Sequence, residues 1–77
     1  MTKRERIIKI VEKFGQNGGV PEADESLFES GYLDSFALPD MIGALEGEFQ
    51  IKIPDADLNP RKFSTIARIE EYVDSRL

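Results

Sequence analysis

Apolar residues near the start of the chain recur at helical spacing. The positions that repeat at intervals of three or four are Ile7, Ile10 or Val11, and Phe14. Thr2 followed three positions later by Glu5 is a capping-box pattern, and Gly15 stands where helices commonly end. We therefore predict an amphipathic helix over residues 2–14.

Residues 15–34 show no sustained period of apolar positions. Glycine, asparagine and proline are frequent in the first part of this segment, and an acidic stretch follows. A loop of about twenty residues is unusual in a compact domain and is usually either functional or disordered. Leu27, Phe28 and Leu33 indicate that this long loop is pinned to the core.

A second apolar stripe predicts a helix over residues 35–50. Its members step by three or four and are Leu38, Met41, Ile42, Leu45 and Phe49. Pro39 has no N–H, so it is tolerated only in the first turn, which places the start of the helix near Asp34 or Ser35. Gly43 and Gly47 each weaken a helix by about 1 kcal/mol relative to alanine. We expect close packing or access for a partner to retain them.

The remainder of the chain predicts little regular structure before a last helix. Residues 51–54 fit a short extended segment because residues before proline avoid the helical region. Residues 54–64 offer one or two short helical turns. The last helix starts near Ser64 or Thr65, both good caps. Its apolar face consists of Ile66, Ile69, Tyr72 or Val73, and Leu77.

These elements predict an all-α fold: a small four-helix bundle of three main helices and one short helix, with a long first loop. No internal repeat or linker divides the chain, so residues 1–77 form one domain. We expect a monomer.

Charge is distributed unevenly. Ten Lys and Arg against fifteen Asp and Glu give a net charge of −5, which argues against nucleic-acid binding. Residues 1–14 carry five bases and two acids, a balance of +3, whereas residues 22–57 carry ten acids against Lys52, a balance of −9. Such an acidic surface either steers basic partners toward the protein or simply keeps it solvated.

Side-chain chemistry for catalysis is sparse. The chain contains no cysteine and no histidine, so it has no thiol nucleophile, no disulfide and no imidazole base. We therefore expect no catalytic activity of its own, no metal site and only partner enzymes acting on it. No apolar run is long enough for a membrane span or a secretory signal, so the expected location is cytoplasmic, without membrane insertion.

The junction between the long loop and the second helix carries Asp34, Ser35 and Phe36. A serine at a helix start is most often a cap that accepts a hydrogen bond from a backbone N–H. A helix N-terminus also favours phosphate, so a phosphate esterified to Ser35 would lie in a favourable field. The residues alone leave both interpretations open.

Several segments together resemble the acyl carrier protein family. They are Leu-Phe-Glu-Ser-Gly-Tyr-Leu-Asp-Ser-Phe at residues 27–36, Ala-Leu-Glu-Gly-Glu-Phe at residues 44–49, Ile-Lys-Ile-Pro at residues 51–54 and Phe-Ser-Thr at residues 63–65. The resemblance covers nearly the whole chain. It implies a bundle of four helices, one of them short, with a Gly-x-x-Asp-Ser motif matched from Gly31 to Ser35.

The resemblance further implies that Ser35 receives 4′-phosphopantetheine from coenzyme A. A separate, magnesium-dependent phosphopantetheinyl transferase makes this attachment in the family. The arm supplies the thiol that the chain lacks and holds an acyl or aminoacyl group as a thioester. Loading ligases and downstream acyl-transferring enzymes are the other partners that the resemblance implies, with fatty acid biosynthesis and lipid metabolism as the broad setting.

Recognition residues are also implied. The transferase would read Asp34, Ser35 and Phe36, whereas Asp40, Glu46 and Glu48 on the second helix would face basic patches on partners. The alternative role of these three acids is solvation.

The sequence differs from that of fatty-acid carriers at the positions after Ser35. Those carriers usually have leucine and then an acid there, whereas this chain has Phe36 and Ala37, and Pro39 replaces an aliphatic residue. Leu-Asp-Ser-Phe looks more like carriers of D-alanine and other specialised carriers. We predict a specialised stand-alone carrier with its cargo left open. The alternative from another class is a helical interaction module with an acidic binding face, in which Ser35 is only a cap.

Overall fold

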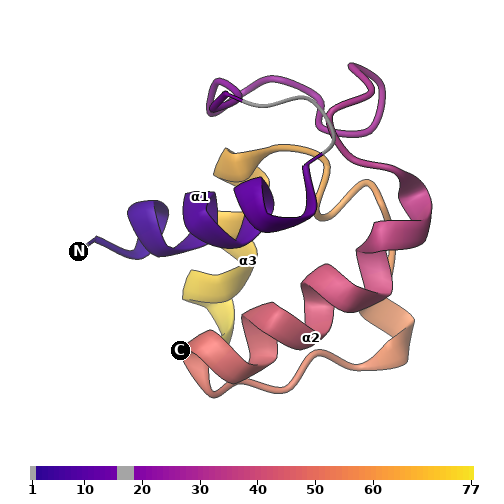
Figure 1. The fold of residues 1–77 in the computed structure, drawn as a ribbon. Helices are drawn as coiled ribbons and strands as arrows, with labels where there is room; N and C mark the ends of the chain where they lie inside the picture. Colours follow the sequence, from indigo (N-terminus) through magenta and orange to yellow (C-terminus); the bar gives the residue numbers. More distant parts are fainter. Residues whose placement is uncertain (1, 16–18) are drawn as a thin grey trace.

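Helical segments follow one another along the described part of the chain (Figure 1). This computed structural model describes residues 2–15 and 19–77, so residues 16–18 of the predicted loop lie outside the described residues. The elements are α1 (Lys3–Phe14), η1 (Ser35–Ala37), α2 (Leu38–Phe49), η2 (Asp55–Asp57) and α3 (Ile66–Arg76). None of the described residues forms a strand, and the predicted all-α fold is confirmed, with η2 as its short helical segment.

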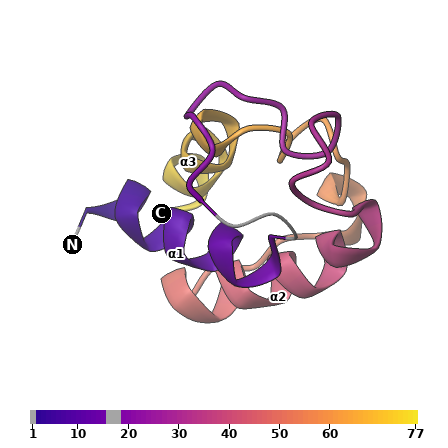
Figure 2. The same ribbon diagram turned by 45° about the horizontal axis from the view of Figure 1, so that its top comes forward.

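Helix α1 begins with the predicted capping box. The Thr2 hydroxyl accepts a hydrogen bond from the Glu5 N–H at 3.1 Å, and the Glu5 carboxylate accepts one from the Thr2 N–H at 3.0 Å. The helix then packs against both α2 and α3 (Figure 1, Figure 2). Its apolar side chains, Ile7, Ile10 and Val11, are buried between them.

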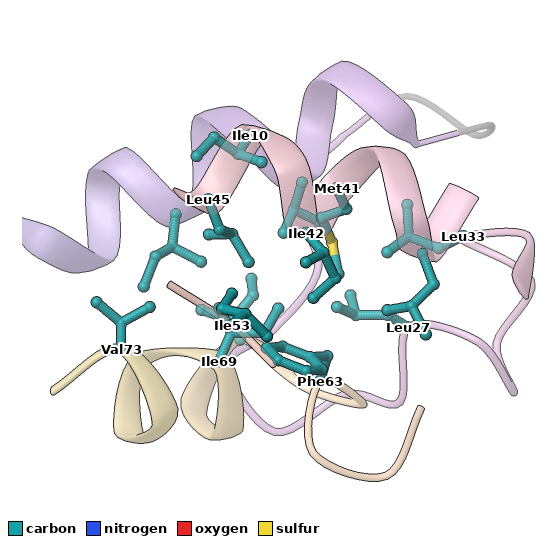
Figure 3. Close-up of a cluster of buried hydrophobic side chains, with 14 of the residues drawn as sticks. Ile10, Leu27, Leu33, Met41, Ile42, Leu45, Ile53, Phe63, Ile69 and Val73 are labelled. Atoms are coloured by element: carbon teal, nitrogen blue, oxygen red, sulfur yellow. The ribbon is translucent and has the colours of Figure 1, made fainter. Parts of the chain in front are cut away.

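The buried side chains of the three α-helices form one core, together with residues from the connecting segments (Figure 3). All predicted members of the α2 stripe are buried, as are Ile66, Ile69 and Val73 of α3. The prediction for Leu77 is wrong, because this residue follows the last turn of α3 and its side chain is 63% exposed. The buried face of α3 therefore ends at Val73.

The long loop is tied to the start of α3 through its backbone. The Leu27 N–H donates to the Ser64 carbonyl at 2.7 Å, and the Ala67 N–H in the first turn of α3 donates to the Ala23 carbonyl at 2.9 Å. The second bond satisfies a donor that has no partner inside the helix. Leu27 is fully buried, so backbone and side chain hold the loop at the same place, as predicted.

Tyr32 holds the two ends of this loop close together. Its hydroxyl donates a hydrogen bond to the Gly19 carbonyl at 2.9 Å. Its ring lies so close to Gly15 that a Cβ added there would come within 2.6 Å of ring carbons. Gly15 has an extended backbone that any residue adopts, so its role is to leave room for the Tyr32 ring.

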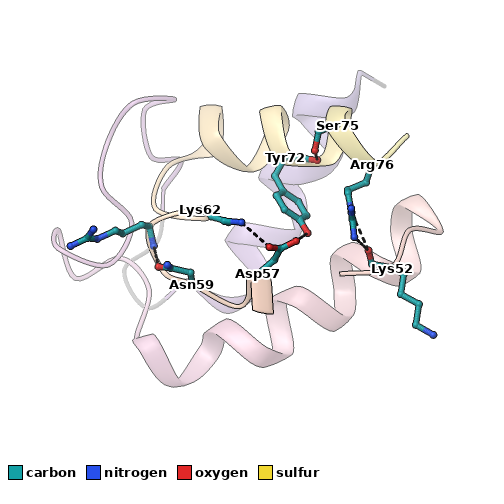
Figure 4. Close-up of polar contacts among 8 residues, drawn as sticks. Lys52, Asp57, Asn59, Lys62, Tyr72, Ser75 and Arg76 are labelled. Carbon is teal, nitrogen blue, oxygen red and sulfur yellow. Dashed lines mark hydrogen bonds and ion pairs between the residues drawn. The ribbon is translucent and has the colours of Figure 1, made fainter. Parts of the chain in front are cut away.

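Polar contacts attach η2 to α3 (Figure 4). The Asp57 carboxylate accepts hydrogen bonds from the Tyr72 hydroxyl at 2.6 Å and from the Lys62 ammonium at 2.7 Å. The bonds from Lys62 and Tyr72 lower the pKa of Asp57. Burial, followed by the hydrogen bond to Asp57, raises the pKa of Tyr72 to about 12.

None of the helices in the described residues has the length and apolar character needed to span a membrane.

Gly15→Ala should destabilise the fold, because the new methyl group overlaps the Tyr32 ring. We expect a loss of about 1–3 kcal/mol in the free energy of unfolding, measured with urea. Gly43→Ala is the matched control, since nothing lies within 4 Å of a Cβ added at this helical position. It should stabilise the fold by about 1 kcal/mol. Equal effects of the two substitutions would contradict the packing described for Tyr32.

Deprotonation of Tyr72 should lower the free energy of unfolding in alkaline solution. Its folded pKa of about 12 lies above the ordinary value of 10.0, so the folded protein holds the phenol proton more tightly than the unfolded chain does. The contribution of Tyr72 is fully present below pH 10.0 and is lost as the pH rises toward 12. Urea unfolding across this window should show a steeper decline for the wild type than for Tyr72→Phe. Parallel curves would show that Tyr72 is not responsible.

Candidate functional site

The junction before α2 is a tight turn rather than the start of a continuous α-helix. An α-helical bond to the Ser35 carbonyl would have to come from Pro39, which has no N–H. The Leu38 N–H donates to this carbonyl instead, and the Ala37 N–H donates to the Asp34 carbonyl at 2.9 Å. Both are the shorter bonds of a 3₁₀ helix. The single predicted helix over residues 35–50 is therefore divided into η1 and α2.

Asp34, and not Ser35, caps this turn. The Asp34 carboxylate accepts a hydrogen bond from the Phe36 N–H at 2.9 Å. The interpretation of Ser35 as a cap is therefore wrong, because the residue before it already fills that role. Both residue types are good caps, and only the folded backbone distinguishes them.

The Ser35 side chain is exposed, and its hydroxyl has no hydrogen-bond partner among the described residues. It is the first residue of η1, so the turn fixes its backbone while leaving its oxygen free. An oxygen presented in this way is accessible to an incoming donor molecule. These residues therefore fit a covalently attached group at Ser35.

The expected favourable field for a phosphate on Ser35 is only partly present. The N–H groups of Phe36 and Ala37 are bonded to Asp34, and that of Leu38 is bonded to Ser35 itself. The N–H groups of residues 36–38 are thus not left for a phosphate, and the Asp34 carboxylate adds negative charge beside it. The turn presents the serine oxygen, but it does not provide a binding cradle for an anion.

Two other predicted site residues, Phe36 and Asp40, follow Ser35 in the sequence and are exposed. The Phe36 side chain is 87% exposed, an unusual state for a large aromatic residue. Asp40 is exposed in the first turn of α2. Burial of Leu38 and Met41 turns Asp40, on the other side of α2, toward solvent.

The two glutamates near the end of α2 are engaged within the fold. The Glu46 carboxylate accepts a hydrogen bond from the Ile53 N–H at 2.8 Å, which fixes the chain after the helix. The Glu48 carboxylate pairs with Arg6 of α1 at 2.6 Å. The sequence indicated partner recognition or solvation for both glutamates and did not reveal these internal partners.

Gly43 and Gly47 lie on the exposed surface of α2. No atom lies within 4 Å of a Cβ added at either position. Close packing inside the molecule therefore does not explain these glycines, and access for a partner remains a prediction.

Comparisons with known proteins show the family of the chain. The family described as phosphopantetheine attachment site matches residues 5–73. A D-alanyl carrier protein of Streptococcus uberis is 33% identical over 73 residues, covering 95% of this chain and 92% of the relative. One from Streptococcus pyogenes serotype M5 is 28% identical over 74 residues, covering 96% and 94%. No solved structure matches the chain.

These matches extend over almost the whole chain, including the turn at Ser35. They favour the carrier over the helical interaction module with an acidic face, and they give no support to fatty acid biosynthesis or lipid metabolism. The chain belongs to the phosphopantetheine carrier proteins, which act through a covalently attached 4′-phosphopantetheine group.

Proposed function

We propose that Ser35 is the attachment point of the phosphopantetheine group and that the protein is a specialised aminoacyl carrier, with D-alanine as its cargo. The observation that carries the proposal is the exposed Ser35 hydroxyl, free of any partner among the described residues, at the start of η1. The D-alanyl carrier proteins of the streptococci support the choice of cargo.

Ser35 supplies the oxygen through which the group is attached, and a separate phosphopantetheinyl transferase brings coenzyme A and magnesium. Asp34 keeps the turn in place through its bonds to Phe36 and Ala37, so the backbone that carries the serine oxygen is held in one position. The attached group supplies a terminal thiol that holds the cargo as a thioester, a chemistry that a chain without cysteine lacks.

Partner enzymes carry out the chemistry, and this chain has no catalytic activity of its own. They comprise the transferase, a ligase that loads the amino acid and the enzymes that receive it, all acting in the cytoplasm on a monomeric carrier. Phe36 and Asp40 are the proposed contacts for these enzymes, together with Asp34. Glu46 and Glu48 act mainly within the fold, because their carboxylates already bind Ile53 and Arg6.

Attachment at Ser35 is testable by mass spectrometry. The protein is incubated with coenzyme A, magnesium and a broad-specificity phosphopantetheinyl transferase. The wild type should gain the mass of one phosphopantetheine group, and Ser35→Ala should gain none. Ser35→Ala should also keep its stability to within about 0.5 kcal/mol, since its hydroxyl bonds nothing among the described residues.

The matched control is Ser30→Ala, an exposed serine of the preceding loop, which should be loaded like the wild type. Modification of Ser35→Ala, or an unmodified wild type under conditions that load a known carrier, would refute the assignment of Ser35.

The cargo is tested on the phosphopantetheine-loaded protein. A ligase that activates D-alanine for the Streptococcus uberis carrier should add one alanyl group when supplied with ATP and D-alanine. The group should be released by hydroxylamine, as a thioester is, and the unloaded protein should not accept it. Acceptance of a fatty acyl chain from an acyl-loading ligase, with no D-alanine transfer, would contradict the proposed cargo while leaving Ser35 as the attachment point.

A further inference from the structure

A basic groove lies along α1, beside the last turn of α2. It encloses about 620 Å³ and is lined by Arg6, Lys9, Ile10, Lys13 and Glu48. Nothing in the proposed carrier chemistry uses these lysines. The groove therefore requires an account of its own.

Arg6 and Glu48 neutralise each other within the groove. The Arg6 Nε donates to the Glu48 carboxylate at 2.6 Å, and its terminal nitrogen donates to the Glu48 carbonyl at 2.8 Å. The guanidinium also lies 4.5 Å from the centre of the Phe49 ring. Arg6 thus holds the end of α2 through two of its five N–H donors.

The positive charge of the groove comes from Lys9 and Lys13. Both side chains are exposed, and neither forms an ion pair with another described residue. They are four positions apart, so they lie on one face of α1, one helical turn from each other. Ile10 beside them is 8% exposed and gives the groove an apolar floor. The groove thus offers two free cations around an apolar strip.

This charge is opposite to that of the surroundings of Ser35. Residues 22–57 carry a balance of −9, which includes Asp34 immediately before the serine and Asp40 five positions after it. Ser35 and Glu48 are at opposite ends of the η1–α2 segment, about 20 Å apart from the rise per residue of the two helix types. The Glu48 end of the groove is therefore separate from the surroundings of Ser35.

We infer that the basic groove docks an acidic segment of a partner protein, in which carboxylates flank an apolar side chain. The two ammonium groups match the carboxylates, and the floor at Ile10 matches the apolar side chain. A phosphate group is a poorer match, because it has no apolar part to contact Ile10 and the side of α1 offers no free N–H. The net charge of −5 opposes adsorption to an anionic membrane.

The test is a titration of the ¹⁵N-labelled protein with a synthetic peptide of alternating glutamate and leucine, followed by NMR. Shift changes should be confined to α1 and the last turn of α2 and should weaken as salt is added. Lys9→Glu/Lys13→Glu should lose about tenfold or more in affinity. Lys9→Gln/Lys13→Gln should also lose binding. This variant removes both positive charges without adding acids, so its loss of binding does not come from a helix weakened by added acids.

The matched control is Lys52→Glu/Arg61→Glu, which reverses two exposed cations outside the groove. Each reversal changes the charge by two units, so both double reversals bring the net charge from −5 to −9. The control should bind within about twofold of the wild type, since only its long-range field differs. All variants should still accept phosphopantetheine. Loss of peptide binding and loss of phosphopantetheine loading are therefore measured separately, so a failure of the docking proposal is distinguishable from a failure of the Ser35 proposal.

Equal losses in the two charge-reversed proteins would overturn the groove as a docking site, as would peptide-induced shifts centred on Ser35. Inorganic phosphate and phosphatidylglycerol vesicles serve as the other probes. Shifts in α1 caused by either of these, with none caused by the peptide, would reject a protein partner.

Discussion

The packing of α1 between α2 and α3 is the interaction on which the rest of the structure depends. In a chain this short the apolar core is small, so each buried residue of α1 contributes a large share of it. Ile7 and Val11 are fully buried. The ion pairs of α1 with its neighbours, including Arg4 with Glu70 and Lys3 with Asp74, lie at the surface and contribute little by comparison. Burial of apolar side chains, and not these ion pairs, holds α1 against its neighbours.

The same packing sets the direction in which the functional surface faces. With Leu38, Met41 and Leu45 turned into the core, the opposite side of α2 presents Asp40 to solvent, and Phe36 is exposed in the preceding η1. The turn before the helix is equally constrained, because Pro39 cannot bond the Ser35 carbonyl and a 3₁₀ turn capped by Asp34 replaces the first α-helical bonds. Ser35 is thus held by its backbone while its side chain remains free, as a covalent attachment site requires.

Charge differs between two regions of the molecule. The acids before and after Ser35 complement the basic surfaces proposed for its enzymes, whereas the lysines of α1 complement the acidic partner inferred for the groove. Opposite charges in two places would let one small domain discriminate between partners. Arg6 links the two regions structurally, since it joins α1 to the end of the helix that begins next to Ser35.

Much of this could be predicted from local patterns. The capping box of Thr2 and Glu5, the apolar stripes and the Asp34-Ser35 junction depend on residues close in sequence, and helical periodicity and capping are local effects. Local patterns did not reveal that Asp34 rather than Ser35 caps the turn, because both residue types serve equally well. They also overestimated the buried face of α3, which ends at Val73 instead of Leu77.

The order of the elements, the burial of their stripes and the chemistry expected at Ser35 were thus contained in the chain itself. Only the folded molecule shows which groups Glu46 and Glu48 bind and that Gly15 contacts Tyr32. It also places Lys9 and Lys13 beside Ile10, with no ion pair to another described residue. Each of these depends on segments that are distant in sequence or on the rotation of one helix against another. Only packing of the whole chain brings such groups together.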